Sequence, residues 1–223
     1  RSQLAGAGTN TAALAFGGSG PSALTEKWNG TNWTEVNDLN TARNQLSGAG
    51  TNTAALAFGG VLPSPERATA ITESYNGTNW SEVNDLNTAR LRGAGAGTQT
   101  SALAFGGQTP STPIFALTEL WNGTNWTEVN DLNTARRELA GAGSSNTNAL
   151  AISGSSNKTT ESWNGTNWTE VGDINNLKND AGAAGTNTAA IAFGGESPSA
   201  GGTNSAVTET FNAGPATVTF DVS

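Results

Sequence analysis

The side chains that could do chemistry in this chain are carboxylates that recur at fixed places. Each of five similar stretches has a glutamate in a Thr-Glu pair, and the first four add a second glutamate and an aspartate. The first set is Glu26, Glu73, Glu119, Glu161 and Glu209; the second is Glu35, Glu82, Glu128 and Glu170; the aspartates are Asp38, Asp85, Asp131 and Asp173. A ring of glutamates could bind a cation or a basic ligand, and Asp and Asn oxygens suit calcium.

A structural role is the favoured interpretation of both kinds of acid. A residue that recurs in every repeat usually does the same structural job in each. We therefore expect the Thr-Glu glutamates to accept hydrogen bonds from the backbone or hydroxyls of a neighbouring unit. We expect the aspartates to form Asx-turns, and they could also pair with Arg43, Arg90 or Arg136. Carboxylate-pair catalysis needs two unlike environments, and no unit shows a singular acid pair.

Other reactive residue types are missing from the sequence. There are no Cys and no His, which removes thiol nucleophiles and the commonest general base and transition-metal ligand. The glycine pairs are not followed by Gly-Lys-Ser/Thr, so they are not phosphate loops. The sequence predicts a protein that is not an enzyme, with no catalytic residue, no cofactor and no metal site.

Composition limits the partners. The chain has 223 residues and a net charge of −8, with no basic cluster, which argues against a nucleic-acid partner. No apolar run approaches the roughly 20 residues of a membrane span. Only 13% of residues are charged, and the abundance of Gly, Ala, Thr, Asn and Ser is typical of many short strands joined by tight turns. The absence of Met and of a secretion signal suggests a processed product or a fragment of a longer polypeptide.

Five repeated units cover the whole chain, at 1–42, 43–89, 90–135, 136–177 and 178–223. Each contains a small-residue stretch such as LAGAGT, then AALAFGG or a variant, then a variable loop, and then a stretch such as LTEKWNG. The first four end on NWTEVNDLN or a variant. Asn-Gly is a preferred hairpin turn, and Gly-Ala strands suit a crowded axis. The units predict an all-β chain, one domain folded as a five-bladed β-propeller of four-stranded antiparallel blades. We expect five blades to close a narrow ring; the alternatives are a piece of a longer array or a ring completed by another chain.

The units resemble the kelch repeat, which has a glycine pair after the second strand and aromatics in the third and fourth. The matching residues are Gly17-Gly18, Trp28 and Trp33; Gly59-Gly60, Tyr75 and Trp80; Gly106-Gly107, Trp121 and Trp126; Ser153-Gly154, Trp163 and Trp168; and Gly194-Gly195 with Phe211. Near-identical units also look like repeat arrays of phage tail fibres and bacterial surface proteins. That likeness implies a structural role in an extracellular or virion-associated fibre, with copies of the chain as partners.

The aromatic residues have two interpretations. Kelch-type aromatics generally pack between blades, which is the favoured interpretation of Trp28, Trp33, Tyr75, Trp80, Trp121, Trp126, Trp163 and Trp168. They could instead stack on sugars. Small five-bladed propellers of near-identical units resemble a class of invertebrate lectins with sugar sites between blades, so a multivalent carbohydrate-binding lectin, with surface glycans as partners, is the alternative function.

Asn-x-Thr/Ser triplets recur in the hairpins and could carry glycans on a surface loop. The asparagines concerned are Asn29, Asn32, Asn76, Asn79, Asn122, Asn125, Asn157, Asn164 and Asn167. The turn interpretation explains Asn-Gly without a glycan, but it does not explain the Thr that follows. Loops 108–112 and 197–205 could carry O-glycans instead.

The last strand differs from its counterparts. Ungapped alignment puts Ala216 where the fourth-strand Trp belongs, and Val218, Phe220 and Val222 then alternate with polar residues. Such a strand can pair within its own blade or be donated to a neighbouring subunit's open edge. We expect own-blade pairing, with the last residues joining subunits.

Overall fold

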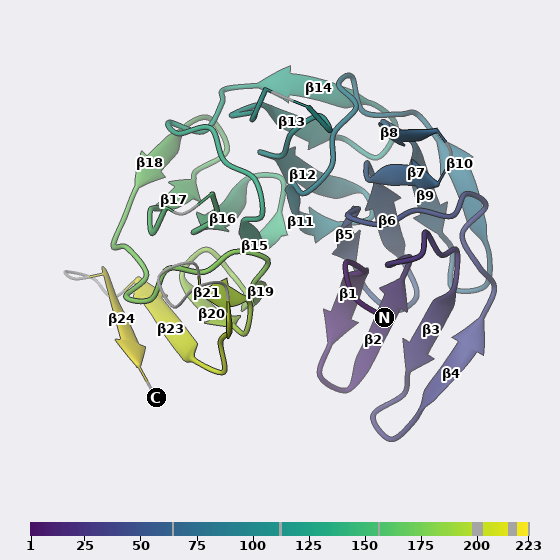
Figure 1. Cartoon of the computed structure of the whole chain (residues 1–223), viewed down its shortest axis with the longest axis horizontal. Coiled ribbons are helices and arrows are strands. Elements are labelled where there is room, and N and C mark those ends of the chain that lie inside the picture. The colour runs from purple at the N-terminus through teal and green to yellow at the C-terminus, as the bar shows by residue number, and fades with distance from the viewer. Residues whose placement is uncertain (64, 112, 156, 198–202, 214–217, 223) are drawn as a thin grey trace.

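The computed structural model describes residues 1–63, 65–111, 113–155, 157–197, 203–213 and 218–222, with side chains for all of these except 66 and 218–222. The fold is all-β, with five four-stranded antiparallel sheets arranged around an axis as the blades of a propeller (Figure 1). Within the described ranges there is no helix long and apolar enough to cross a membrane.

Each blade takes its strands in chain order from the axis outward. Blade one has β1 (Ala5–Thr9), β2 (Ala12–Phe16), β3 (Thr25–Trp28) and β4 (Trp33–Val36). Blade two has β5 (Ser47–Gly50), β6 (Ala55–Phe58), β9 (Thr72–Tyr75) and β10 (Trp80–Val83). Blade three has β11 (Ala94–Thr98), β12 (Ser101–Phe105), β13 (Thr118–Trp121) and β14 (Trp126–Val129).

Blade four has β15 (Ala140–Ser145), β16 (Asn148–Ile152), β17 (Thr160–Trp163) and β18 (Trp168–Glu170). Blade five has β19 (Gly182–Gly185), β20 (Ala189–Phe193), β23 (Thr208–Ala213) and β24 (Val218–Val222). The variable loops of blades two and five form small hairpins, β7 (Val61–Pro63) with β8 (Glu66–Ala68), and β21 (Glu196–Ser197) with β22 (Thr203–Asn204).

The innermost strands are made of Gly and Ala because they almost touch. A Cβ on Gly95 of β11 would lie 2.6 Å from the carbonyl oxygen of Gly48 of β5, closer than any side chain tolerates. Further out, an aromatic pair fills each of the first three junctions: Phe58 of blade two, for example, meets Trp126 of blade three edge-on, with ring centroids 5.0 Å apart. Small residues inside and aromatics outside make a wedge, and we infer that this wedge sets the rotation from one blade to the next.

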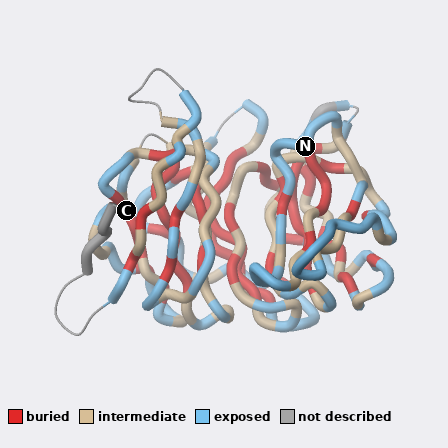
Figure 2. Tube along the Cα trace, turned by 90° about the horizontal axis from the view of Figure 1, so that it is seen from below, coloured by how far each residue is buried: buried red, intermediate tan, exposed pale blue. Residues whose placement is uncertain are grey.

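The arc of blades is open between blade one and blade five (Figure 1), which differs from the closed ring that we expected. Five wedges of this size do not complete a circle. Figure 2 shows the buried residues gathered within the blades on both sides of this opening. Among the described residues, the large hydrophobic side chains that stay exposed all belong to the two end blades: Leu4, Leu24, Trp33, Ile191 and Phe193.

The C-terminal strand pairs within its own blade. β24 runs antiparallel to β23, with Phe220 opposite Phe211 and Val218 opposite Ala213. Val218, Phe220 and Val222 therefore lie in the fourth strand of blade five. Phe220 lies opposite Phe211 as Trp33 lies opposite Trp28, so the ungapped alignment was wrong and Phe220, not Ala216, holds the register position of the fourth-strand Trp. Ala216 itself lies outside the described residues.

Candidate functional site

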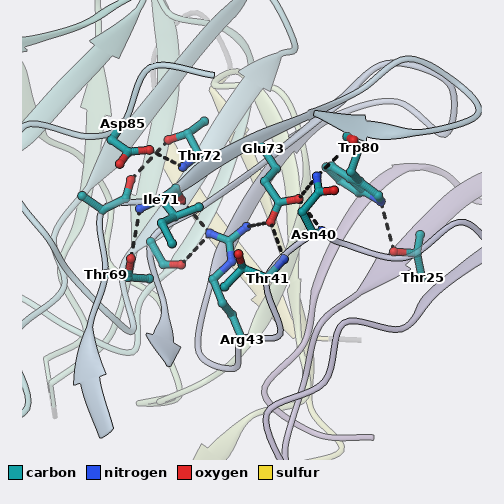
Figure 3. Close-up of polar contacts among 12 residues, drawn as sticks. Thr25, Asn40, Thr41, Arg43, Thr69, Ile71, Thr72, Glu73, Trp80 and Asp85 are labelled. Atoms are coloured by element: carbon teal, nitrogen blue, oxygen red, sulfur yellow. Dashed lines mark hydrogen bonds and ion pairs between the residues drawn. The ribbon is translucent and has the colours of Figure 1, made fainter. Parts of the chain in front are cut away.

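The repeated glutamates are anchors between blades. Glu73 of blade two accepts hydrogen bonds from Arg43 Nη2 at 2.9 Å and from three donors on the link that leaves blade one (Figure 3). These donors are the backbone N–H of Asn40 at 2.7 Å, the Asn40 side-chain amide at 2.8 Å and the backbone N–H of Thr41 at 3.3 Å. One carboxylate thus binds both the link between blades and the arginine that follows the link. The hydrogen bonds from backbone N–H groups of a neighbouring blade are those that the sequence predicted.

The arginine at this junction is fully buried. Arg43 Nη1 donates to the carbonyl oxygens of Gly59 at 3.0 Å and Ile71 at 2.6 Å, so it also ties the second strand's end to the third strand's start. Burial lowers the pKa of the Arg43 guanidinium, and the Glu73 carboxylate opposes that change. The same ion pair recurs between Arg90 and Glu119 and between Arg136 and Glu161.

The repeated aspartates bind a backbone N–H of their own blade and do not pair with the arginines. Asp85 Oδ1 accepts a hydrogen bond from the backbone N–H of Thr72 at 3.0 Å, joining the end of β10 to the start of β9 (Figure 3). The same contact joins Asp38 to Thr25, Asp131 to Thr118 and Asp173 to Thr160. The suggested Asp–Arg pairing was wrong, because each buried arginine pairs with the glutamate instead. Among the described residues, no group of acids is placed to hold a metal ion.

The aromatic side chains lie in two environments. In blades two to four they are at most 5% exposed, and Trp80 Nε1 donates to Thr25 Oγ1 of the preceding blade at 3.1 Å. The buried set is Tyr75, Trp80, Trp121, Trp126, Trp163 and Trp168. In blade one, Trp28 is half-buried and Trp33 is 49% exposed. Of these eight described aromatics, only Trp28 and Trp33 therefore have a face that a ligand or partner could cover.

The triplet asparagines lie in hairpin turns on the outer rim. The first of each pair, Asn29, Asn76, Asn122 or Asn164, accepts backbone N–H bonds from the two residues that close the turn. Asn79, Asn125 and Asn167 accept a side-chain amide from the preceding blade, at 2.6, 2.7 and 2.9 Å. These seven and Asn32 are exposed, whereas Asn157 is half-buried and bonds to Thr159. Of the loops expected to carry O-glycans, Thr112 and 198–202 lie outside the described residues.

A second site lies around the axis, two residues before each innermost strand. We call it the axial ring; its members are Gln3, Gln45, Arg92, Glu138 and Asp180. All five have a left-handed backbone, with φ between 51° and 58°, which costs on the order of 1 kcal/mol for each residue other than glycine. The backbone N–H groups of the last four members each donate to the carbonyl of the member before, at 2.8 to 3.0 Å.

The axial ring lines a cavity of about 550 Å³, whose wall also includes Leu4, Leu46 and Leu139. Arg92 connects ring members, because its Nε donates to Gln45 Oε1 at 2.9 Å and its Nη1 pairs with Glu138. Asp180 makes no such pair with any residue that the structure describes. Burial and the neighbouring Glu138 carboxylate raise the Asp180 pKa. The cavity thus presents polar groups of both charges beside three leucines, a more polar lining than is usual for a small-molecule site.

The sequence reasoning missed the axial ring. Glu138 and Asp180 are acids that no other unit repeats, although we had found no singular acid pair. The ring could have been found from the residue two positions after the basic residue that starts each unit. This residue is Gln in units one and two, Arg in unit three, Glu in unit four and Asp in unit five. We had sought what the repeats share, and this position is where they differ.

The comparisons with known proteins leave the family open. No protein-family model matches the chain, and no curated protein sequence matches it. The β-propeller fold therefore stands on the structure alone, and the kelch and phage-fibre resemblances remain expectations from the repeat.

Proposed function

We propose that this chain is a non-enzymatic structural β-propeller, a subunit or segment of an extracellular or virion-associated fibre. The observation that supports this most is the use made of the repeated carboxylates. Glu73, Glu119 and Glu161 are buried and bound to an arginine and to the preceding link, so they hold blades together and are not free to act on a substrate.

Imaging of the native particle tests the proposal. Cryo-electron microscopy of the assembly that contains this chain should show the open propeller repeated along a filament. An antibody against the variable loop at 61–68 should label that filament. Recovery of the native protein only as a free monomer, with no label on any assembly, would reject the fibre role.

Glycosylation forms part of the proposal, because the hairpin asparagines are exposed and their triplets are intact. Native material should have a mass above that of the bare 22.5 kDa polypeptide, and removal of N-glycans should restore the bare mass. A native mass equal to the polypeptide would show that these asparagines, and the loops considered for O-glycans, are unmodified in that material.

Carbohydrate binding is the second candidate, and the axial cavity is the observation in its favour. Sugars are held by side-chain amides, carboxylates and guanidinium groups over an apolar wall, and the cavity offers all three with Leu46 and Leu139. Because all five ring residues line one shared cavity, this site would bind one ligand per chain, not five. Glycan-array binding that is lost in Arg92→Ala would support it. Five equivalent sugar sites in a titration would instead favour sites between blades.

A further inference from the structure

The two end blades of the arc expose opposite halves of one interface. At the first three junctions inside the chain, blade n presents a phenylalanine from its second strand and a threonine hydroxyl from its third. Blade n+1 presents a fourth-strand tryptophan and a first-strand glycine. At the junction of blades one and two, Phe16 lies edge-on against Trp80 at 5.0 Å, and a Cβ on Gly48 would lie 2.7 Å from Phe16 Cζ.

Blade one has the receiving half of this interface with nothing in it. Trp33, the counterpart of Trp80, is 49% exposed instead of 5%. Gly6, the counterpart of Gly48, has no phenyl ring above it, since a Cβ there would meet only the Leu14 carbonyl oxygen. The Glu26 side chain is 42% exposed, and in the described part of the chain its carboxylate is bound only by Arg1.

Blade five has the inserting half. Phe193, the counterpart of Phe16, is 42% exposed, whereas Phe16 is fully buried. The Phe193 ring packs over Gly182 of its own blade, where an added Cβ would lie 2.7 Å from the ring. Among the residues that the structure describes, no further blade stands beside Phe193 to cover it. Ile191 beside it is 40% exposed. The hydroxyl of Thr208 is the counterpart of the group that accepts the Trp80 indole N–H.

We propose that blade five of one copy docks on blade one of a second copy, with Phe193 seated over Gly6 and against Trp33. This rests on the proposed fibre function and specifies its self-contact. The interface is heterologous, so it adds copies in one direction. The five blades already occupy most of the circle (Figure 1). A second copy can therefore follow only when it is displaced along the axis, which makes a helical filament and not a closed ring.

The docked interface should be weaker than the internal ones. Inside the chain, the Asn40 amide and backbone secure Glu73 from the preceding link. The groups that blade five offers to blade one, Phe193, Ile191 and the Thr208 hydroxyl, include no such amide for Glu26. Association should then be reversible and depend on the concentration of the chain.

Complementation between two variants tests the proposal. Trp33→Glu disables the receiving half and Phe193→Glu the inserting half, and both positions are exposed, so each variant should fold. Sedimentation velocity should show concentration-dependent oligomers for the unaltered chain and at least tenfold weaker association for each variant alone. A mixture of the two should form a 1:1 dimer that grows no further, because only one competent pair of halves remains. Thr127→Glu, on an exposed outer strand of blade three, is the matched control and should associate normally.

Either of two results would overturn the docking: an unaltered chain that stays monomeric at all concentrations, or an equimolar mixture of the variants that stays monomeric while the unaltered chain associates. These results are separable from the fibre role. If native filaments contain the propeller but Trp33→Glu chains assemble like the control, the fibre stands and this contact is wrong. If docking behaves as described but no native filament contains the chain, the fibre role fails.

Discussion

Two sites that lie two residues apart in every unit, the buried blade junction and the axial ring, have opposite patterns of variation. The junction repeats an arginine and glutamate in blades two, three and four, and each pair is buried. The axial ring has Gln, Gln, Arg, Glu and Asp on the same left-handed backbone. The junction must satisfy a buried charge with fixed partners, so its residues cannot vary independently. The ring faces a cavity, so each side chain is free to differ.

The same comparison separates the ends of the arc from its middle. Glu26 and Arg1 form the junction pair of blade one, but Glu26 is half-exposed because no preceding blade covers it. At blade five, Lys178 replaces the arginine, and the Asn176 side chain donates to Glu209 Oε1 at 3.1 Å in its place. The contacts made by the junction glutamate therefore depend on which blade stands beside it and on the residues that face it.

The largest expected effect comes from removing a buried junction carboxylate. Glu119→Gln leaves the Arg90 guanidinium buried without a counter-charge, and should lower the free energy of unfolding by about 3–5 kcal/mol. Glu26→Gln, the matched change at the exposed junction, should cost less than about 1 kcal/mol. Chemical denaturation of both variants measures the difference. Equal losses would mean that burial by the neighbouring blade does not govern the strength of the junction.

A smaller effect, this time stabilising, is expected at the junction of blades four and five, whose sequence differs from that of the other junctions. Among the described residues, no ion pair joins Lys178 to Glu209; Lys178 Nζ donates instead to the Val207 and Gly194 carbonyls. Changing Asn176→Thr together with Lys178→Arg restores the Thr and Arg that the other junctions have at these two positions. This should raise the free energy of unfolding by about 1 kcal/mol. Asn176→Thr alone is the control and should destabilise, since it removes a donor without supplying the arginine.

The smallest expected effect is at the axial ring and depends on pH. The Asp180 pKa is raised by burial and by Glu138, with Glu196 adding to the rise and Arg92 and Arg137 opposing it. A raised carboxyl pKa means that the folded state binds the proton more tightly, so this stabilising contribution is present at low pH and is lost as pH rises through the folded-state pKa.

Asp180→Asn should therefore raise the melting temperature slightly at neutral pH, and the gain should vanish as the pH falls below the ordinary aspartate range. Thermal unfolding followed across that range measures it. Glu128→Gln, the same acid-to-amide change at an exposed acid on blade three, provides the matched control. A gain that is the same at every pH would show that the Asp180 charge is not its cause.

The sequence by itself determined the blade. The recurrence of Ala-Leu-Ala-Phe-Gly-Gly, Asn-Gly and two aromatics predicted four short antiparallel strands per unit, because turn chemistry and side-chain alternation act within about ten residues. The structural use of the glutamates was also predictable, since a residue repeated in every unit meets the same neighbours in each. The partner of the arginine was not, because Arg43 and Glu73 are 30 residues apart and only the blade brings them together.

Only the tertiary structure decided three features: that the arc stays open, how far Trp33 is exposed, and that the axial ring exists. Trp33 and Trp80 lie in nearly identical sequences, but one is half-exposed and the other buried, because burial depends on whether another blade stands beside it. Whether the arc closes depends on the sum of the rotations between successive blades. A sequence pattern within one unit does not reveal that sum. The axial ring gathers one side chain from each unit, at positions more than 40 residues apart, so its cavity exists only when the blades surround a common axis.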